Sequence, residues 1–146
     1  MKISPHFTVD ELTRTGTGLV NAPGRTAQAA LVALCVEILE PLRAALGAPV
    51  RITSGFRSPE VNAAIGGSPT SAHMLGLAAD VKSTAGDAAH ILRVLHQLDL
   101  DELDQAIGYA PAQGGHVHVG LSRPGRAPRR QFLWRDGAGY RPWTPR

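Results

Sequence analysis

Two histidines and an aspartate stand in this sequence where they could bind one metal ion. His73 and Asp80 lie seven positions apart, and Gly76 between them allows the backbone to turn sharply. A second pair of histidines, His116 and His118, follows much later in the run HVHV. Two imidazoles and a carboxylate, with a fourth position left open, are typical ligands of a catalytic zinc site. A zinc centre is therefore the chemistry that these residues favour.

Both segments have the alternation of a short strand. In residues 77–82 the alternation places Asp80 on one face and apolar side chains on the other. In the second strand His116 and His118 share one face, while the valines that follow each of them face the core. If the two strands lie side by side, Asp80 and His118 can reach the same ion.

The motifs, taken in chain order, resemble those of a known family. They are SGFRS at 54–58, the box SxHxxGxAxD at 71–80, and HVHV at 116–119. This order resembles the zinc D-Ala-D-Ala carboxypeptidases and murein endopeptidases of the M15 group. Among these, the short members found in bacteriophage lysins and virion proteins are the most similar. The resemblance covers nearly the whole chain.

The resemblance implies a fold and a set of metal ligands. The fold is α+β, with a small antiparallel sheet, flanking helices and the zinc in a groove on the sheet, as in hedgehog signalling domains. The zinc ligands are His73, Asp80 and His118. The first histidine of HVHV, His116, is then a neighbour that assists the transition state, with a plain site-lining role as the alternative.

Two further residues match positions that touch the substrate in the family. Arg57 would hold a substrate carboxylate or carbonyl, a task that suits a planar guanidinium. Its alternative is a structural ion pair near the start of a helix. Ser71 would also contact the substrate, and its alternative is a hydroxyl that stabilises a turn.

One position departs from the family pattern. M15 enzymes normally supply a Glu or Asp shortly before the last zinc ligand, where it takes a proton from the attacking water and passes it to the leaving amine. Here that position is Tyr109, and no Asp or Glu occurs between Asp104 and Asp136. Either another acid serves, with Asp101 and Glu102 closest in sequence, or the base is absent. Tyr109 could donate a hydrogen bond to an oxyanion, but a phenol with a pKa of ~10 is a poor base.

The surrounding sequence predicts the elements that position these residues. A long helix capped by Thr26 has apolar residues at three- and four-residue intervals, and Pro41 is expected to kink it. Thr84 is predicted to cap a second helix over residues 85–98. Strands are predicted at 50–54, 77–82, 104–109 and 116–121. Together these elements favour a single α+β domain over residues 1–146.

Cys35 is the only cysteine, so the chain cannot form an intramolecular disulfide. It lies in the most apolar part of the first long helix. We therefore expect a buried and unreactive thiol.

The C-terminal segment, residues 122–146, is basic and aromatic. The formal net charge of the chain is +3, and arginines of this segment contribute much of it. Such a surface favours an anionic partner, such as a cell-wall polymer or a nucleic acid. The alternatives are a solvated tail and a contact with phage structural proteins in an assembly. No nucleic-acid motif accompanies it. Its aromatic residues indicate a folded segment rather than a bare polybasic arm; they are Phe132, Trp134, Tyr140 and Trp143.

The sequence also indicates where in the cell the protein is made and where it acts. No apolar run approaches the ~20 residues of a membrane span. The N-terminal residues lack the apolar core of a secretory signal. We expect the protein to be made in the cytoplasm and to reach the cell wall after holin release or as part of a virion.

Two functions of different classes follow. The favoured one is a zinc-dependent peptidoglycan peptidase of phage or prophage type, which cleaves a stem or cross-link peptide bond that involves a D-amino acid. The alternative is a catalytically impaired relative with a structural or cell-wall-binding role, for example in a virion. The intact ligand set favours the enzyme, whereas the missing carboxylate favours the alternative.

Overall fold

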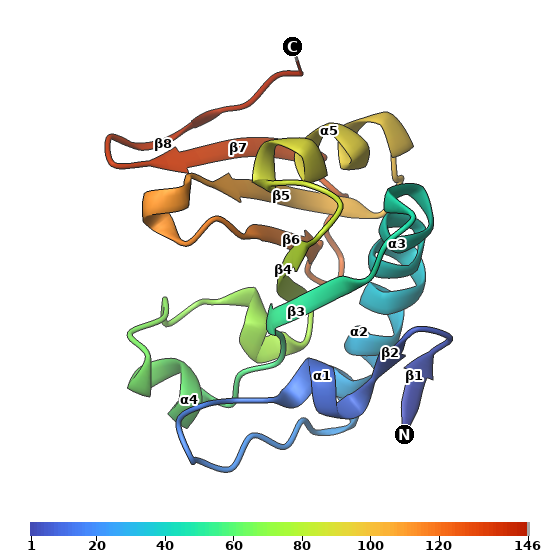
Figure 1. Ribbon diagram of the computed structural model, residues 1–146. Helices are drawn as coiled ribbons and strands as arrows, with labels where there is room; N and C mark the ends of the chain where they lie inside the picture. Colours follow the sequence, from blue (N-terminus) through green and yellow to red (C-terminus); the bar gives the residue numbers. More distant parts are fainter. Residues whose placement is uncertain (146) are drawn as a thin grey trace.

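The computed structural model describes residues 1–145, and its elements form two sheets with helices around them (Figure 1). The strands are β1 (Lys2–Ser4), β2 (Phe7–Thr8), β3 (Val50–Ser54), β4 (Ala78–Ser83), β5 (Leu103–Tyr109), β6 (Val117–Leu121), β7 (Gln131–Asp136) and β8 (Gly139–Pro142). The α-helices are α1 (Val9–Thr13), α2 (Arg25–Leu34), α3 (Glu40–Leu46), α4 (Pro59–Ala64) and α5 (Ala88–Leu98). A π-helix, η1 (Cys35–Leu39), and two 3-10 helices, η2 (Ala72–Leu75) and η3 (Pro111–Gln113), complete the set. This architecture confirms the predicted α+β fold.

The main sheet has the strand order β3-β4-β6-β5-β7-β8. Its first four strands pair antiparallel, as predicted, but β7 runs parallel to β5 and β8 returns antiparallel to β7. The antiparallel sheet expected from the sequence is thus the larger part of a mixed sheet. The C-terminal segment is folded, and it supplies the last two strands. Arg146, which belongs to that segment, lies outside the described residues.

The sheet has one covered face and one open face. Side chains that point to the covered face, among them Val81, Val117 and Val119, are fully buried. They pack in one hydrophobic cluster with residues of α2, α3 and α5, and Figure 1 shows α2 and α3 stacked along one side of the sheet. Because alternate residues point to opposite faces, Asp80 and His118 point to the open face. No helix within residues 1–145 has both the length and the apolar character that a membrane span requires.

The first long helix is divided at its middle. It begins at Arg25 with Gly24 as its N-cap, so the predicted cap, Thr26, is wrong by two positions. The π-helix η1 then joins α2 to α3, and Pro41 lies in the first turn of α3. Proline has no N–H to donate, and its ring clashes with the carbonyl four residues earlier in a regular helix. The wider π turn changes the hydrogen-bond register at that point, so the helix tolerates the proline.

The predicted start of α5 is wrong by three residues. The helix begins at Ala88, and the side chain of Asp87 caps it by accepting a hydrogen bond from the backbone N–H of His90 at 2.9 Å. The preceding residues form a tight turn instead, in which Ser83 pairs with Gly86. Thr84 therefore lies in the turn, and Asp87 supplies the carboxylate that a helix N-terminus favours.

Cys35 is fully buried, as predicted. Burial raises the pKa of its thiol to about 12, so the reactive thiolate is scarce at ordinary pH. We expect a thiol reagent such as dithionitrobenzoate to modify the native protein very slowly at pH 8 and the unfolded protein rapidly. Complete modification of the native protein at the unfolded rate would show that the core around η1 is open.

Candidate metal centre

The structure brings together His73, Asp80 and His118. Strands β4 and β6 pair with Asp80 directly opposite His118, so the two side chains share the open face of the sheet. His73 reaches them from η2, which precedes β4. The distance from Asp80 Oδ1 to His73 Nε2 is 3.3 Å and that to His118 Nδ1 is 3.1 Å. One potential ligand atom from each residue lies within 4.8 Å of the others.

The two distances from Asp80 fit a tetrahedral metal ion. Metal–nitrogen and metal–oxygen bonds of ~2.0–2.1 Å place ligand atoms about 3.3–3.4 Å apart in a tetrahedron. The second ring nitrogen of His73, Nδ1, lies 2.7 Å from the backbone oxygen of Gly55. Because a carbonyl only accepts hydrogen bonds, Nδ1 carries a proton, and Nε2 is the ring nitrogen that faces Asp80. Such a bond orients a metal-binding histidine and fixes its tautomer.

Asp80 is ionised although it is buried. Burial opposes its charge, but hydrogen bonds from His118 and His73 outweigh this effect and hold the pKa of Asp80 well below its usual range. Arg57 adds an ion pair, with 3.3 Å between its Nη2 and Asp80 Oδ2. One carboxylate oxygen therefore faces the two imidazoles and the other faces the guanidinium.

Gly76 makes the turn that separates His73 from Asp80. It ends η2 with a φ of 72°, a conformation that glycine adopts without strain. A Cβ atom there would lie 2.4 Å from the backbone oxygen of Ala27 in α2. The turn predicted from the sequence thus also allows η2 to pack closely against α2.

Arg57 lies beside the candidate metal-binding group, which consists of His73, Asp80 and His118, and three partners hold its guanidinium. Its Nε donates to the hydroxyl of Ser54 at 3.0 Å, and Nη1 donates to the side-chain oxygen of Asn62 at 3.5 Å. Its ion pair with Asp80 is the third contact. Arg57 therefore forms the structural ion pair that was one of its two predicted roles. Because this ion pair lies in the candidate site, the guanidinium is also close enough for the other predicted role, contact with substrate. Its contact with substrate remains a prediction.

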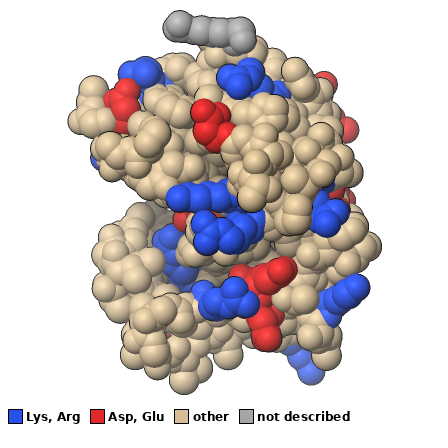
Figure 2. Space-filling view, viewed as in Figure 1, with Lys and Arg blue, Asp and Glu red and all other residues tan. Residues whose placement is uncertain are grey.

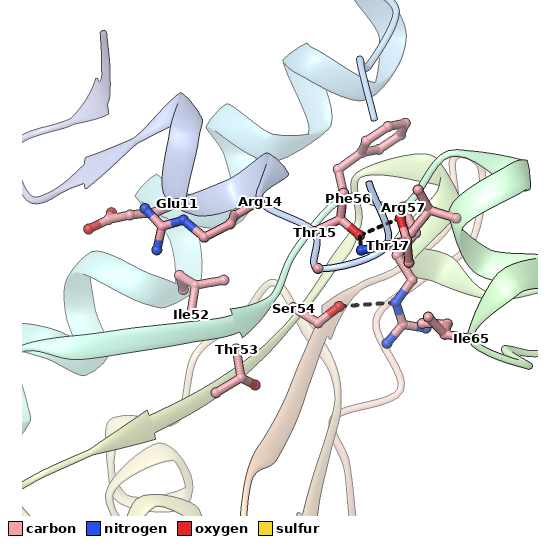
Figure 3. Close-up of a pocket in the computed structure, with 12 residues that line it drawn as sticks. Glu11, Arg14, Thr15, Thr17, Ile52, Thr53, Ser54, Phe56, Arg57 and Ile65 are labelled. Atoms are coloured by element: carbon pink, nitrogen blue, oxygen red, sulfur yellow. Dashed lines mark hydrogen bonds between the residues drawn. The ribbon is translucent and has the colours of Figure 1, made fainter. Parts of the chain in front are cut away.

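A cavity of about 540 Å³ opens next to Arg57. Figure 3 shows Arg57 and Ser54 at one end of this cavity and Glu11 with Arg14 at the other. Figure 2, viewed as in Figure 1, shows a hollow across the middle of the molecule. The hollow lies between the end that holds β8 and the end that holds α1 and α4. Lysine and arginine side chains gather along it. This part of the open face therefore favours anionic or polar ligands.

Tyr109 and His116 form a stacked pair on the open face. Their ring centroids are 4.2 Å apart, and the Tyr109 hydroxyl lies 3.2 Å from that of Tyr140 in β8. Burial raises the pKa of Tyr109, and the hydrogen bond with Tyr140 adds to this effect. Burial also lowers the pKa of His116. Both side chains are therefore neutral at pH 7 and can donate hydrogen bonds.

Ser71 lies at the edge of a second cavity, on the His118 side of the metal-binding group. Its hydroxyl accepts a hydrogen bond from the backbone N–H of His73 at 3.2 Å, which is the turn-stabilising role. It also lines the cavity together with His118 and Tyr109. A contact with substrate remains a prediction for Ser71.

The model of one protein family, described as peptidase M15, matches residues 5–120. The chain belongs to the M15 peptidase family. The match contains the three metal-binding candidates as well as Arg57, Tyr109 and His116, and it ends before the C-terminal segment. A search of curated proteins found no match. The family assignment thus confirms the resemblance that the sequence motifs indicated.

The structure does not bring Asp101 or Glu102 to the M15 site. Both are exposed in the turn before β5. Ile107 is the residue of β5 that pairs with His118, and Glu102 lies five positions before it. At ~3.3 Å per residue this is about 16 Å along the strand. The interpretation that one of these two acids replaces the family carboxylate is therefore wrong.

Two other acids line the cavities, and sequence reasoning did not consider either as the missing base. Asp104 lies in the cavity that contains His118, but Arg129 binds both of its oxygens, at 3.2 and 2.8 Å. These hydrogen bonds lower the pKa of Asp104. Glu11 lines the cavity beside Arg57, but its carboxylate accepts a hydrogen bond from the backbone N–H of Thr8 at the start of α1. Both carboxylates are thus held by other partners.

Proposed function

We propose that this protein is a zinc-dependent peptidoglycan peptidase that hydrolyses a stem or cross-link peptide bond. One observation carries the proposal: in a chain of the M15 family, one potential ligand atom from each of His73, Asp80 and His118 lies within 4.8 Å of the others, and both distances from Asp80 suit a tetrahedral site. Two nitrogen ligands and one carboxylate oxygen suit zinc, and such a set leaves a position for substrate and water.

When bound, zinc would supply a Lewis acid that polarises the scissile carbonyl and lowers the pKa of water toward ~7. The side chains around the site would orient the peptide. Arg57, fixed by Ser54 and Asn62, can donate to a substrate carbonyl or carboxylate. Tyr109 and His116, both neutral, can donate to an oxyanion as charge develops.

The two cavities indicate how a peptide would lie. One borders Arg57 and the other borders His118, so they flank the metal-binding group on opposite sides. An extended peptide that occupies both would carry its scissile bond across Asp80. The residues around Asp80 would then act on the scissile bond, and the two cavities would bind the parts of the peptide on either side of it.

A second candidate is a catalytically impaired structural or cell-wall-binding module, for example in a virion. Tyr109, at the position of the M15 carboxylate, favours it. Loss of a general base typically costs ~10²–10⁴ in rate, so the protein would be a slow enzyme or an inactive one. For either candidate we propose a phage or prophage origin and action at the cell wall.

Release of muropeptides from purified sacculi tests the proposal. We expect slow release by the zinc-loaded protein, none after the metal is removed with a chelator, and recovery when zinc is returned. Mass spectrometry of the products identifies the bond. Binding to sacculi without release under any of these conditions would support the second candidate, and equal release with and without metal would contradict a zinc peptidase.

A further inference from the structure

The cavity on the His118 side is lined in part by a loop that lies beyond the family match. This cavity has a volume of about 280 Å³. His118 and Tyr109 lie at one side of it, and residues of two loops, 68–72 and 122–130, form the other side. The second loop connects β6 to β7 and supplies Arg123 and Arg129 to the lining. The basic C-terminal segment therefore begins inside the candidate site.

Arg123 is held in place without losing its charge. Its Nη2 donates a hydrogen bond to the backbone oxygen of Thr70, so the two loops meet across the cavity. Within residues 1–145 it forms no ion pair. A guanidinium has five N–H donors in a rigid fork, and this contact uses one of them. The arginine is thus oriented in advance for a further acceptor.

The charge balance of this cavity favours an anion. Arg129 is neutralised because it forms an ion pair with Asp104 at 2.8 Å. Arg123 therefore leaves one uncompensated positive charge on the lining. Three hydroxyl groups of the facing loop lie in the same cavity, those of Ser68, Thr70 and Ser71. A planar guanidinium beside hydroxyl donors suits a carboxylate, which accepts two hydrogen bonds side by side.

We propose that Arg123 forms a substrate subsite that binds a carboxylate of the peptide, about three residues from the scissile bond. The inference rests on the proposed peptidase function. His118 lies three residues before the end of β6, which is about 10 Å along a strand. An extended peptide advances ~3.3–3.6 Å per residue, so that span corresponds to about three residues.

Paired muropeptides test the subsite. The two members of each pair differ only in whether one stem-peptide carboxylate is free or amidated. Calorimetry gives the binding affinity for the zinc-free protein, which cannot turn the ligand over, and hydrolysis assays give kcat/KM for the zinc-loaded protein. Loss of a charge-assisted hydrogen bond should weaken binding of the amide by about 10- to 100-fold.

Substitution of Arg123 should remove that preference. In Arg123→Gln we expect the free acid to bind as weakly as the amide, with the affinity for the amide unchanged within about two-fold. Arg126→Gln is the matched control, because Arg126 is an exposed arginine of the same loop that does not line this cavity. Arg123→Lys keeps the charge, so part of the preference should return.

The possible results distinguish a failure of the proposed carboxylate subsite from a failure of the proposed peptidase function. Equal affinity of the wild-type protein for acid and amide, or a preference that Arg123→Gln leaves intact, would overturn the subsite. If the acid binds preferentially through Arg123 but neither peptide is hydrolysed, the subsite stands and the peptidase proposal fails. Circular dichroism of the variants must match that of the wild type, and Arg123→Lys provides the comparison if Arg123→Gln does not fold.

Discussion

Tyr109→Glu should accelerate peptidoglycan hydrolysis. The substitution places a carboxylate where the family resemblance puts the general base, on the open face and beside the ring of His116. A positioned general base contributes ~10²–10⁴ in rate. We expect a gain near the lower end of this range, because glutamate is shorter than tyrosine and loses the contact with Tyr140. Muropeptide release by the zinc-loaded variant and wild type gives the ratio.

Tyr109→Gln is the matched control for this prediction. Glutamine has the size of glutamate and cannot accept a proton at neutral pH, so it removes the tyrosine without adding a base. We expect Tyr109→Gln to be no faster than the wild type. If Tyr109→Glu and Tyr109→Gln release muropeptides at the same rate, the absent carboxylate is not what limits the protein.

His73→Ala should abolish zinc binding and activity together. The ring of His73 is buried, and its Nδ1 is engaged by Gly55, so no other side chain is oriented in the same way to replace Nε2. Loss of a residue that merely orients a ligand typically costs 10–100-fold in metal affinity, and loss of a ligand itself should cost more. We expect about one zinc per wild-type chain and little zinc in the variant. Hydrolysis should fall to background.

His90→Ala is the matched control for the loss of zinc. His90 lies in the first turn of α5, outside the metal-binding group. We expect this variant to keep its zinc and its rate of hydrolysis. Metal analysis after dialysis measures the zinc content of both variants under the same conditions. Undiminished zinc in His73→Ala would contradict the assignment of His73 as a ligand.

Local pattern was enough to predict the residues that gather at the site. The alternation in β4 and β6 places Asp80 and His118 on the open face whatever the rest of the sheet does, because strand side chains alternate with a period of two. The glycine between His73 and Asp80 indicates the turn. The burial of Cys35 follows from the apolar spacing of its helix. These features depend on near neighbours in the sequence.

Contacts between distant segments could not be predicted in the same way. The parallel pairing of β5 with β7 joins residues 26 positions apart, such as Gln105 and Gln131, whose side-chain amides lie 2.8 Å apart. The contact between Tyr109 and Tyr140 depends on that pairing. Nothing local in either segment specifies its partner strand. Sequence reasoning therefore found the candidate metal-binding group, but it missed that Tyr140 and the loop of residues 122–130 lie next to the site.

The exclusion of Asp101 and Glu102 required the strand register. Their closeness in sequence to Tyr109 made them candidates, but a strand extends ~3.3 Å for each residue. The pairing of Ile107 with His118 places them far from the metal-binding group. By contrast, Arg57 is 23 positions from Asp80 in sequence and contacts it in space. Distance along the chain is a poor guide to membership of this site.

The most direct test of the account is a crystal structure of the zinc-loaded protein with anomalous scattering measured at the zinc edge. The account predicts one strong peak per chain, about 2.0–2.2 Å from His73 Nε2, Asp80 Oδ1 and His118 Nδ1. An empty site in crystals that contain stoichiometric zinc, or a peak bound by other residues, would contradict it.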